Sequence, residues 1–211
     1  PADRDLYCST VAITHYAKGV AHAALGDVAA AEAERALFRE ATERVPKSRR
    51  IHNVPCVQLL AVAEEMLEGE IAYRRDELDK AFAHLRAASA LEDDLPYDEP
   101  WGWMQPVRHA LGALLLEQGR AAEAEAVYRE DLGLGGSLPR AQIHPDNLWA
   151  LHGLLDCLER RGETAETILI RQRAAFAAAR ADSPVSVSCF CARRKAPDHP
   201  EVAAPGTTCC G

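Results

Sequence analysis

The chain has 211 residues, of which 48% are apolar and 6% aromatic, and its net charge is −8 from 32 acidic and 24 basic residues. Long runs of Ala, Leu, Glu and Arg favour helix over sheet, and this length suits one continuous core. The acidic balance argues against nucleic acid as a partner, because phosphate binding needs a clustered basic surface.

Four pairs of helices are predicted in chain order from a repeated spacing of small residues. In each pair a small residue is followed seven positions later by Gly or a substitute, and five positions further on by another small residue. The four sets are Gly19, Gly26 and Ala31; Gly69, Asp76 and Ala81; Gly112, Gly119 and Ala124; and Leu155, Gly162 and Thr167, in which Asp, Leu and Thr are substitutes.

Close packing explains this spacing. A small residue midway along a first helix lets the second helix approach, and a Gly at its end takes the left-handed conformation that reverses the chain. Each set therefore predicts a helix-turn-helix unit. A generic amphipathic bundle is the alternative, since Ala-rich sequences also produce such spacings.

The third unit is the clearest and reads HALGALLLEQGRAAEAEAVYREDL from His109, with Tyr128 and Leu132 completing its pattern. It resembles a tetratricopeptide repeat, a unit that buries its apolar face only by stacking on copies of itself. The resemblance covers about residues 10–180, and the segment is also similar to uncharacterised microbial proteins of this family. It departs from the family pattern at Lys18 and Glu68, where an apolar residue is expected.

The resemblance implies an all-α, tetratricopeptide-like solenoid of about four units over residues 1–182, followed by an irregular, Cys-containing tail at 183–211. The units recur at 50, 43 and 43 residues, from 19 to 69, from 69 to 112 and from 119 to 162. The family period is about 34 residues, so we expect longer helices or inserted loops. The family usually binds a peptide or partner protein on its concave face.

Three loops separate the predicted units, at 46–55, 93–106 and 132–147. The second carries Trp101 and Trp103, which are large and costly to leave in water. Either they fill the seam between the second and third units, or they wall a binding pocket with Tyr97, Asp98 and Glu99.

One face of each first helix is expected to line the concave groove, an inference from the resemblance. Residues six and three before the small position, and one and four after it, share this face, which we call the stripe. In chain order the stripe holds Ile13, Tyr16, Val20 and Ala23; Ala63, Met66, Glu70 and Tyr73; Pro106, His109, Ala113 and Leu116; and Trp149, His152, Asp156 and Glu159.

Within the stripe, His109 and His152 occupy equivalent positions in neighbouring units. We expect them to converge on one ligand, with Trp149 beside them; the alternative is that each histidine satisfies a polar position of its own. The predicted binding residues are Tyr16, Met66, Tyr73, Trp101, Trp103, His109, Trp149, His152 and Asp156.

Seven cysteines suggest a second hypothesis. Cys157 lies in an apolar helical run and is predicted to be buried, whereas Cys189-Phe-Cys191 is a soft-metal pattern that suits copper(I) or zinc. If the tail folds back, Cys189 and Cys191 would join His109, His152 or Met66 around a metal, giving a metal-binding protein or metalloenzyme. No known catalytic motif is present, so we do not expect an enzyme.

Targeting signals are also absent from the sequence. No apolar run approaches 18 residues and no charged-then-apolar leader opens the chain, so we predict neither a membrane span nor a signal peptide, and expect a cytoplasmic protein. Because the chain begins at Pro1 rather than Met, we expect the native N-terminus to lie upstream.

Overall fold

The computed structural model describes Asp3 and residues 5–189. This part of the chain is almost entirely helical, with one short two-stranded hairpin. Its elements are α1 (Cys8–Ala24), α2 (Val28–Glu43), β1 (Arg50–Ile51), β2 (Val54–Pro55), α3 (Cys56–Arg74), α4 (Leu78–Asp93), α5 (Val107–Glu117), α6 (Ala121–Asp131), α7 (Leu148–Arg161) and α8 (Thr164–Ala178). The prediction of an all-α chain is confirmed.

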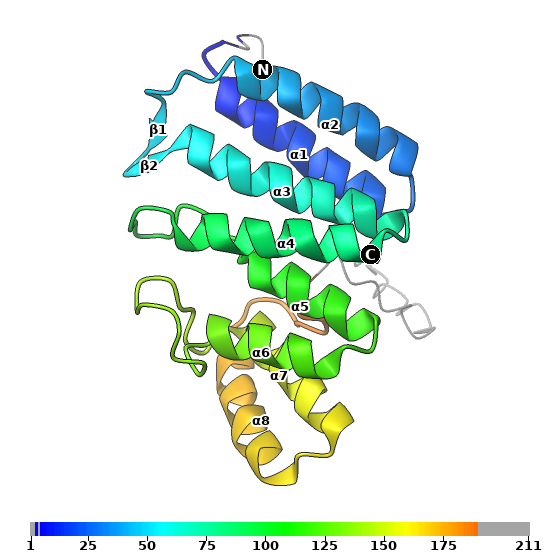
Figure 1. Cartoon of the computed structure of the whole chain (residues 1–211). Coiled ribbons are helices and arrows are strands. Elements are labelled where there is room, and N and C mark those ends of the chain that lie inside the picture. The colour runs from blue at the N-terminus through cyan, green and yellow to red at the C-terminus, as the bar shows by residue number, and fades with distance from the viewer. Residues whose placement is uncertain (1–2, 4, 190–211) are drawn as a thin grey trace, which may run out of the picture.

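Consecutive helices form four hairpins, α1 with α2, α3 with α4, α5 with α6 and α7 with α8. The hairpins follow one another along the molecule, as Figure 1 shows. Each first helix also packs on a neighbouring one, α1 on α3 and α5 on α7, while α4 contacts α5 and α6 contacts α7. The fold is therefore repeat-like: every hairpin buries its apolar face against the next.

The four predicted turn residues all adopt the left-handed conformation. The φ angle is +84° at Gly26, +62° at Asp76, +73° at Gly119 and +73° at Gly162. Gly takes this conformation without steric cost, and Asp tolerates it better than most residues. The seven-residue spacing thus located the chain reversal of every hairpin.

Small residues are present where helices approach closely. A Cβ on Gly19 would lie 2.8 Å from the side chain of Leu67, and one on Gly69 would lie 2.9 Å from that of Leu85. In the fourth hairpin this role falls to Gly153, two residues before the position occupied by Leu155 in the predicted register.

The buried side chains form two clusters. One joins α1, α2, α3 and the start of α5, and contains Tyr16, Met66 and Trp103. The other joins the end of α3 to α4–α8 and includes Tyr73, Tyr128 and Cys157, so the predicted burial of Cys157 is confirmed. Cys8, Cys56 and Cys157 are free thiols, all of them buried.

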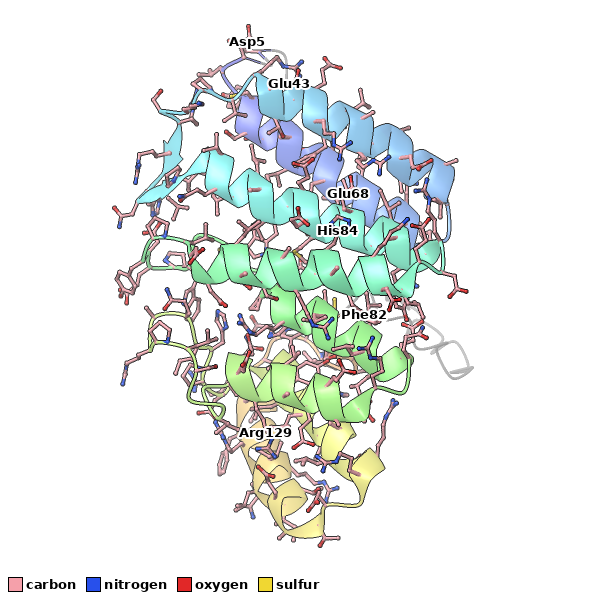
Figure 2. The ribbon with its side chains drawn as sticks, viewed as in Figure 1. Asp5, Glu43, Glu68, Phe82, His84 and Arg129 are labelled. Atoms are coloured by element: carbon pink, nitrogen blue, oxygen red, sulfur yellow. The ribbon has the colours of Figure 1, made fainter. Side chains whose placement is uncertain are left out.

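The exterior in Figure 2 is rich in ion pairs that connect neighbouring helices. Glu68 of α3 pairs with Arg35 and Arg39 of α2, and Arg129 of α6 pairs with Glu166 of α8. Surface pairs of this kind contribute little stability each, but they mark this side as solvated. In the described part of the chain, no helix is both long and apolar enough to cross a membrane.

Three connecting segments meet at one end of the hairpins: the β1–β2 hairpin, the α4–α5 loop and the α6–α7 loop (Figure 1). Side chains join them. The Asn53 side chain donates to the Tyr97 carbonyl at 3.4 Å, and Trp101 Nε1 donates to the Ala141 carbonyl at 3.0 Å. The long loops therefore form one structured region.

Candidate functional site

A groove of about 140 Å³ runs between the first helices of the third and fourth hairpins, α5 and α7. Ala113, Leu116 and Glu117 line it from α5, and His152, Gly153, Asp156 and Arg160 line it from α7. Four of these residues, Ala113, Leu116, His152 and Asp156, belong to the stripe. The packing of α5 on α7 brings stripe positions of neighbouring units to one surface.

The chain itself forms a third wall of this groove. After α8 it turns back toward α5 as an irregular segment, drawn in orange in Figure 1, and Ser186, Val187 and Ser188 complete the groove lining. Ser188 is only 6% exposed and Cys189 only 3%, and Cys189 joins the first apolar cluster. The described part of the tail thus folds back, whereas its continuation from residue 190 lies outside the described residues.

Beneath Ser188 lies Tyr128 of α6, whose ring passes between α5 and α7 and forms the floor under the segment. A Cβ on either Gly112 or Gly153 would overlap the ring of Tyr128, so both helices need glycine there. The Tyr128 hydroxyl meets the Ser188 hydroxyl at 2.5 Å. Burial raises the pKa of Tyr128 well above its ordinary value, so its hydroxyl stays protonated and can donate or accept.

The α7 wall of the groove is charged but internally paired. Arg160 donates to both carboxylate oxygens of Asp156, at 3.0 and 3.1 Å, and to the Leu116 carbonyl at 3.0 Å. This arrangement fixes both side chains and bridges α7 to the end of α5. The pair therefore places a polar rim beside the apolar surface of Ala113 and Leu116.

His109 and His152 are held in different surroundings. His109 Nε2 lies 3.1 Å from Asp131 Oδ2 at the end of α6, and His144 Nδ1 lies 2.9 Å from the other oxygen of the same carboxylate. Burial alone would raise the pKa of Asp131, but the hydrogen bonds from the two histidines outweigh it, and that pKa lies below its ordinary value. His109 is therefore hydrogen-bonded to a buried carboxylate of its own hairpin, while His152 lines the groove. Trp149 is half-buried and does not line the described groove.

The predicted binding residues of the first two hairpins, Tyr16, Met66 and Tyr73, are buried, whereas Ile13 of the same stripe is 37% exposed. The Tyr16 hydroxyl donates to Met66 Sδ at 3.4 Å, and the Tyr16 ring meets Trp103 edge-on at 5.6 Å. Tyr73 packs against Phe82, and its hydroxyl accepts from the Gln118 side chain at 2.7 Å. Tyr16, Met66 and Tyr73 thus belong to the apolar clusters rather than to an open groove surface.

The two tryptophans lie in different surroundings. Trp103 is 8% exposed and packs into the first cluster, which fits the seam interpretation. Trp101 is 45% exposed, lies edge-on to His144, and lines small cavities with Tyr97 and Asp98. Glu99 joins them only in the outer hollow of about 370 Å³.

The inner cavity beside these residues measures about 30 Å³, room for about two water molecules. Three buried polar atoms of its lining residues have no hydrogen-bond partner within the described chain: Glu92 Oε1, Trp103 Nε1 and Gln142 Oε1. Glu92 Oε2 accepts from the Val107 amide at 3.0 Å, yet burial raises the pKa of Glu92 to about 8. Sequence reasoning missed Glu92, although the helical spacing of Ala81, Leu85 and Ala88 continues onto it.

The metal hypothesis extends past the described residues, because Cys191 lies outside them. Cys189 is disulfide-bonded, and the other described cysteines are free thiols. Among residues 5–189, no group of three or more His, Cys, Asp or Glu side chains is arranged to hold a metal ion. The copper or zinc site therefore stays a hypothesis.

No protein-family model, curated protein or solved structure matches this chain. Its own geometry defines the class: an all-α, helical-repeat-like protein with a groove between α5 and α7. The function is therefore argued from that groove.

Proposed function

We propose that this protein is a tetratricopeptide-like α-solenoid that binds an extended peptide segment of a partner protein in the groove between α5 and α7. The observation that carries the proposal is the position of Ser186, Val187 and Ser188, a non-helical stretch that packs beside α5 and α7 and lines the groove. The left-handed turns and the glycines at helix approaches support the family resemblance. Cytoplasmic location is part of the same proposal.

The chemistry of the groove suits such a segment. Ala113, Leu116 and Gly153 leave room for small apolar side chains, and the Tyr128 hydroxyl offers one polar contact at the floor. Arg160 of the groove is already paired with Asp156, so its guanidinium group is not available to bind a ligand carboxylate. We therefore expect an internal, uncharged stretch of the partner rather than its acidic C-terminus.

The test is selection of peptides from a random library displayed on phage, followed by binding measurements on the full chain. Peptides that use the groove should bind His152→Ala at least about tenfold more weakly, since that residue lines one wall. His84→Ala is the matched control, because His84 lies on α4, outside the groove, and pairs with Glu65. If no peptide is retained, or if both variants bind equally well, the proposal is wrong.

A further inference from the structure

The segment in the groove has the composition of a ligand. Residues 183–189 read Ser-Pro-Val-Ser-Val-Ser-Cys, with no charged side chain and no large one. Pro184 opposes continuation of α8, because proline has no amide hydrogen and clashes with the preceding turn. The segment therefore crosses the groove in non-helical form, as a bound peptide would.

Few hydrogen bonds attach this segment to the helices. The last backbone hydrogen bond of the α8 end runs from Ala181 to Ala178, and none joins residues 182–189 to the rest of the described chain. The Tyr128–Ser188 hydroxyl pair is the side-chain hydrogen bond that ties the segment to the groove floor. Segments with so few bonds belong to the parts of a protein that open without global unfolding.

The disulfide of Cys189 does not tether the segment to the helices. Cys8, Cys56 and Cys157, the cysteines of the helical part, are free thiols. Within the described chain, the segment is held by the burial of Cys189 and by the Tyr128 contact, both of which are non-covalent. No bond between described cysteines joins the segment to the helices.

Departure of the segment would leave the Tyr128 hydroxyl without its partner between two helices that approach closely. A buried hydroxyl without a partner is costly, so the vacated floor favours a ligand with a hydroxyl or carbonyl at that point. The Tyr128 ring already fills the space beside Gly112 and Gly153. The floor thus selects small hydroxyl side chains, as Ser188 illustrates.

We infer that residues 183–189 are a built-in ligand of the groove, and that a partner displaces them with an extended segment of small, uncharged side chains that places a Ser or Thr hydroxyl on Tyr128. This inference rests on the proposed function and adds to it the ligand class and its regulation. A short tether keeps the built-in segment at an effective concentration of roughly millimolar. A free peptide must compete with it, so its apparent affinity falls by the fraction of time for which the groove is open.

The experiment compares two variants of the full chain, each of which introduces one positive charge. Ser188→Lys places an ammonium group at a buried position and should expel the segment, because an unpaired charge is not tolerated there. Ala181→Lys introduces the same group at an exposed position outside both the segment and the groove lining, and should leave the segment in place. The probe is a fluorescein-labelled Ser-Pro-Val-Ser-Val-Ser peptide, and its binding is followed by fluorescence anisotropy.

We expect Ser188→Lys to bind the labelled peptide at least about tenfold more tightly than the wild type, and Ala181→Lys to match the wild type. Equal, measurable binding by all three proteins overturns the inference, although peptide recognition itself would stand. Absence of binding by all three overturns the inference but not the proposed function if peptides selected from the library still bind. The two failures are therefore distinguishable.

Hydrogen exchange on the wild-type chain provides a second test that does not depend on the folding of a variant. If the segment is displaceable, the amides of Val185, Val187 and Ser188 should exchange much faster than those at the centres of α5 and α7. Equal protection in the segment and the two helices would show that the segment opens only with the whole protein, and would overturn the inference.

Discussion

Replacement of Glu92 by glutamine should change how the stability of this protein depends on pH. The Glu92 carboxyl has one oxygen bonded to the Val107 amide and the other buried without a partner in the described chain. Burial raises its pKa from 4.5 to about 8, although the Val107 amide and Arg108 work in the opposite direction. At pH values between 4.5 and about 8, Glu92 is therefore protonated in the folded state and ionised in the unfolded state.

The sign and size of the effect follow from proton linkage. Between the two pKa values the folded protein binds more protons than the unfolded chain, so the free energy of unfolding falls as the pH rises. The slope is about 1.4 kcal/mol per pH unit, or about 4 kcal/mol between about pH 5 and about pH 8. Glu92→Gln has no proton to lose and should lack this contribution.

The assay is urea denaturation of the wild type and of Glu92→Gln across this pH range, from which the difference in unfolding free energy is taken. That difference should shift in favour of the variant as the pH rises. Glu77→Gln is the control: Glu77 is exposed, and its hydrogen bond with Lys80 lowers its pKa, so its contribution is lost as the pH falls. A difference between wild type and Glu92→Gln that does not vary with pH would refute the reasoning.

Three further results are expected. Gly153→Ala should lower the free energy of unfolding by about 1–3 kcal/mol in urea denaturation, because the new Cβ overlaps the Tyr128 ring; an unchanged value would show that α7 moves freely from α6. His109→Ala should cost about 1–3 kcal/mol by the same measurement, since it removes one of the two histidines on the buried Asp131 carboxylate, and a neutral outcome would mean that water replaces it. The metal hypothesis predicts stoichiometric copper or zinc by elemental analysis, lost in Cys191→Ser, whereas the scaffold proposal predicts that EDTA leaves peptide binding unchanged.

The features that the sequence predicted well depend on local backbone geometry. The turns at Gly26, Asp76, Gly119 and Gly162 require a left-handed residue, and the repeated spacing exposes that requirement directly. Placement of His152 on the face that forms the groove follows from helical periodicity once α5 and α7 pack together.

The features that the sequence did not predict depend on contacts between distant residues. His109 lies at the expected stripe position, but its partner is Asp131 in the second helix of the same hairpin, and periodicity along one helix does not reveal that contact. Likewise, Ser188 lies in a segment without a helical pattern. Its position depends on a hydrogen bond with Tyr128, whose ring packs against glycines of two other helices.

The central claim, that the groove between α5 and α7 receives an extended peptide, is tested most directly by ¹H–¹⁵N NMR. The labelled protein is Ser188→Lys, and the added ligand is unlabelled Ser-Pro-Val-Ser-Val-Ser peptide. The account predicts that amide shifts change at Ala113, Leu116 and Gly153 and stay constant at His84 and Arg86 on α4. Shift changes confined to α4, or spread evenly over all eight helices of the described chain, would contradict it.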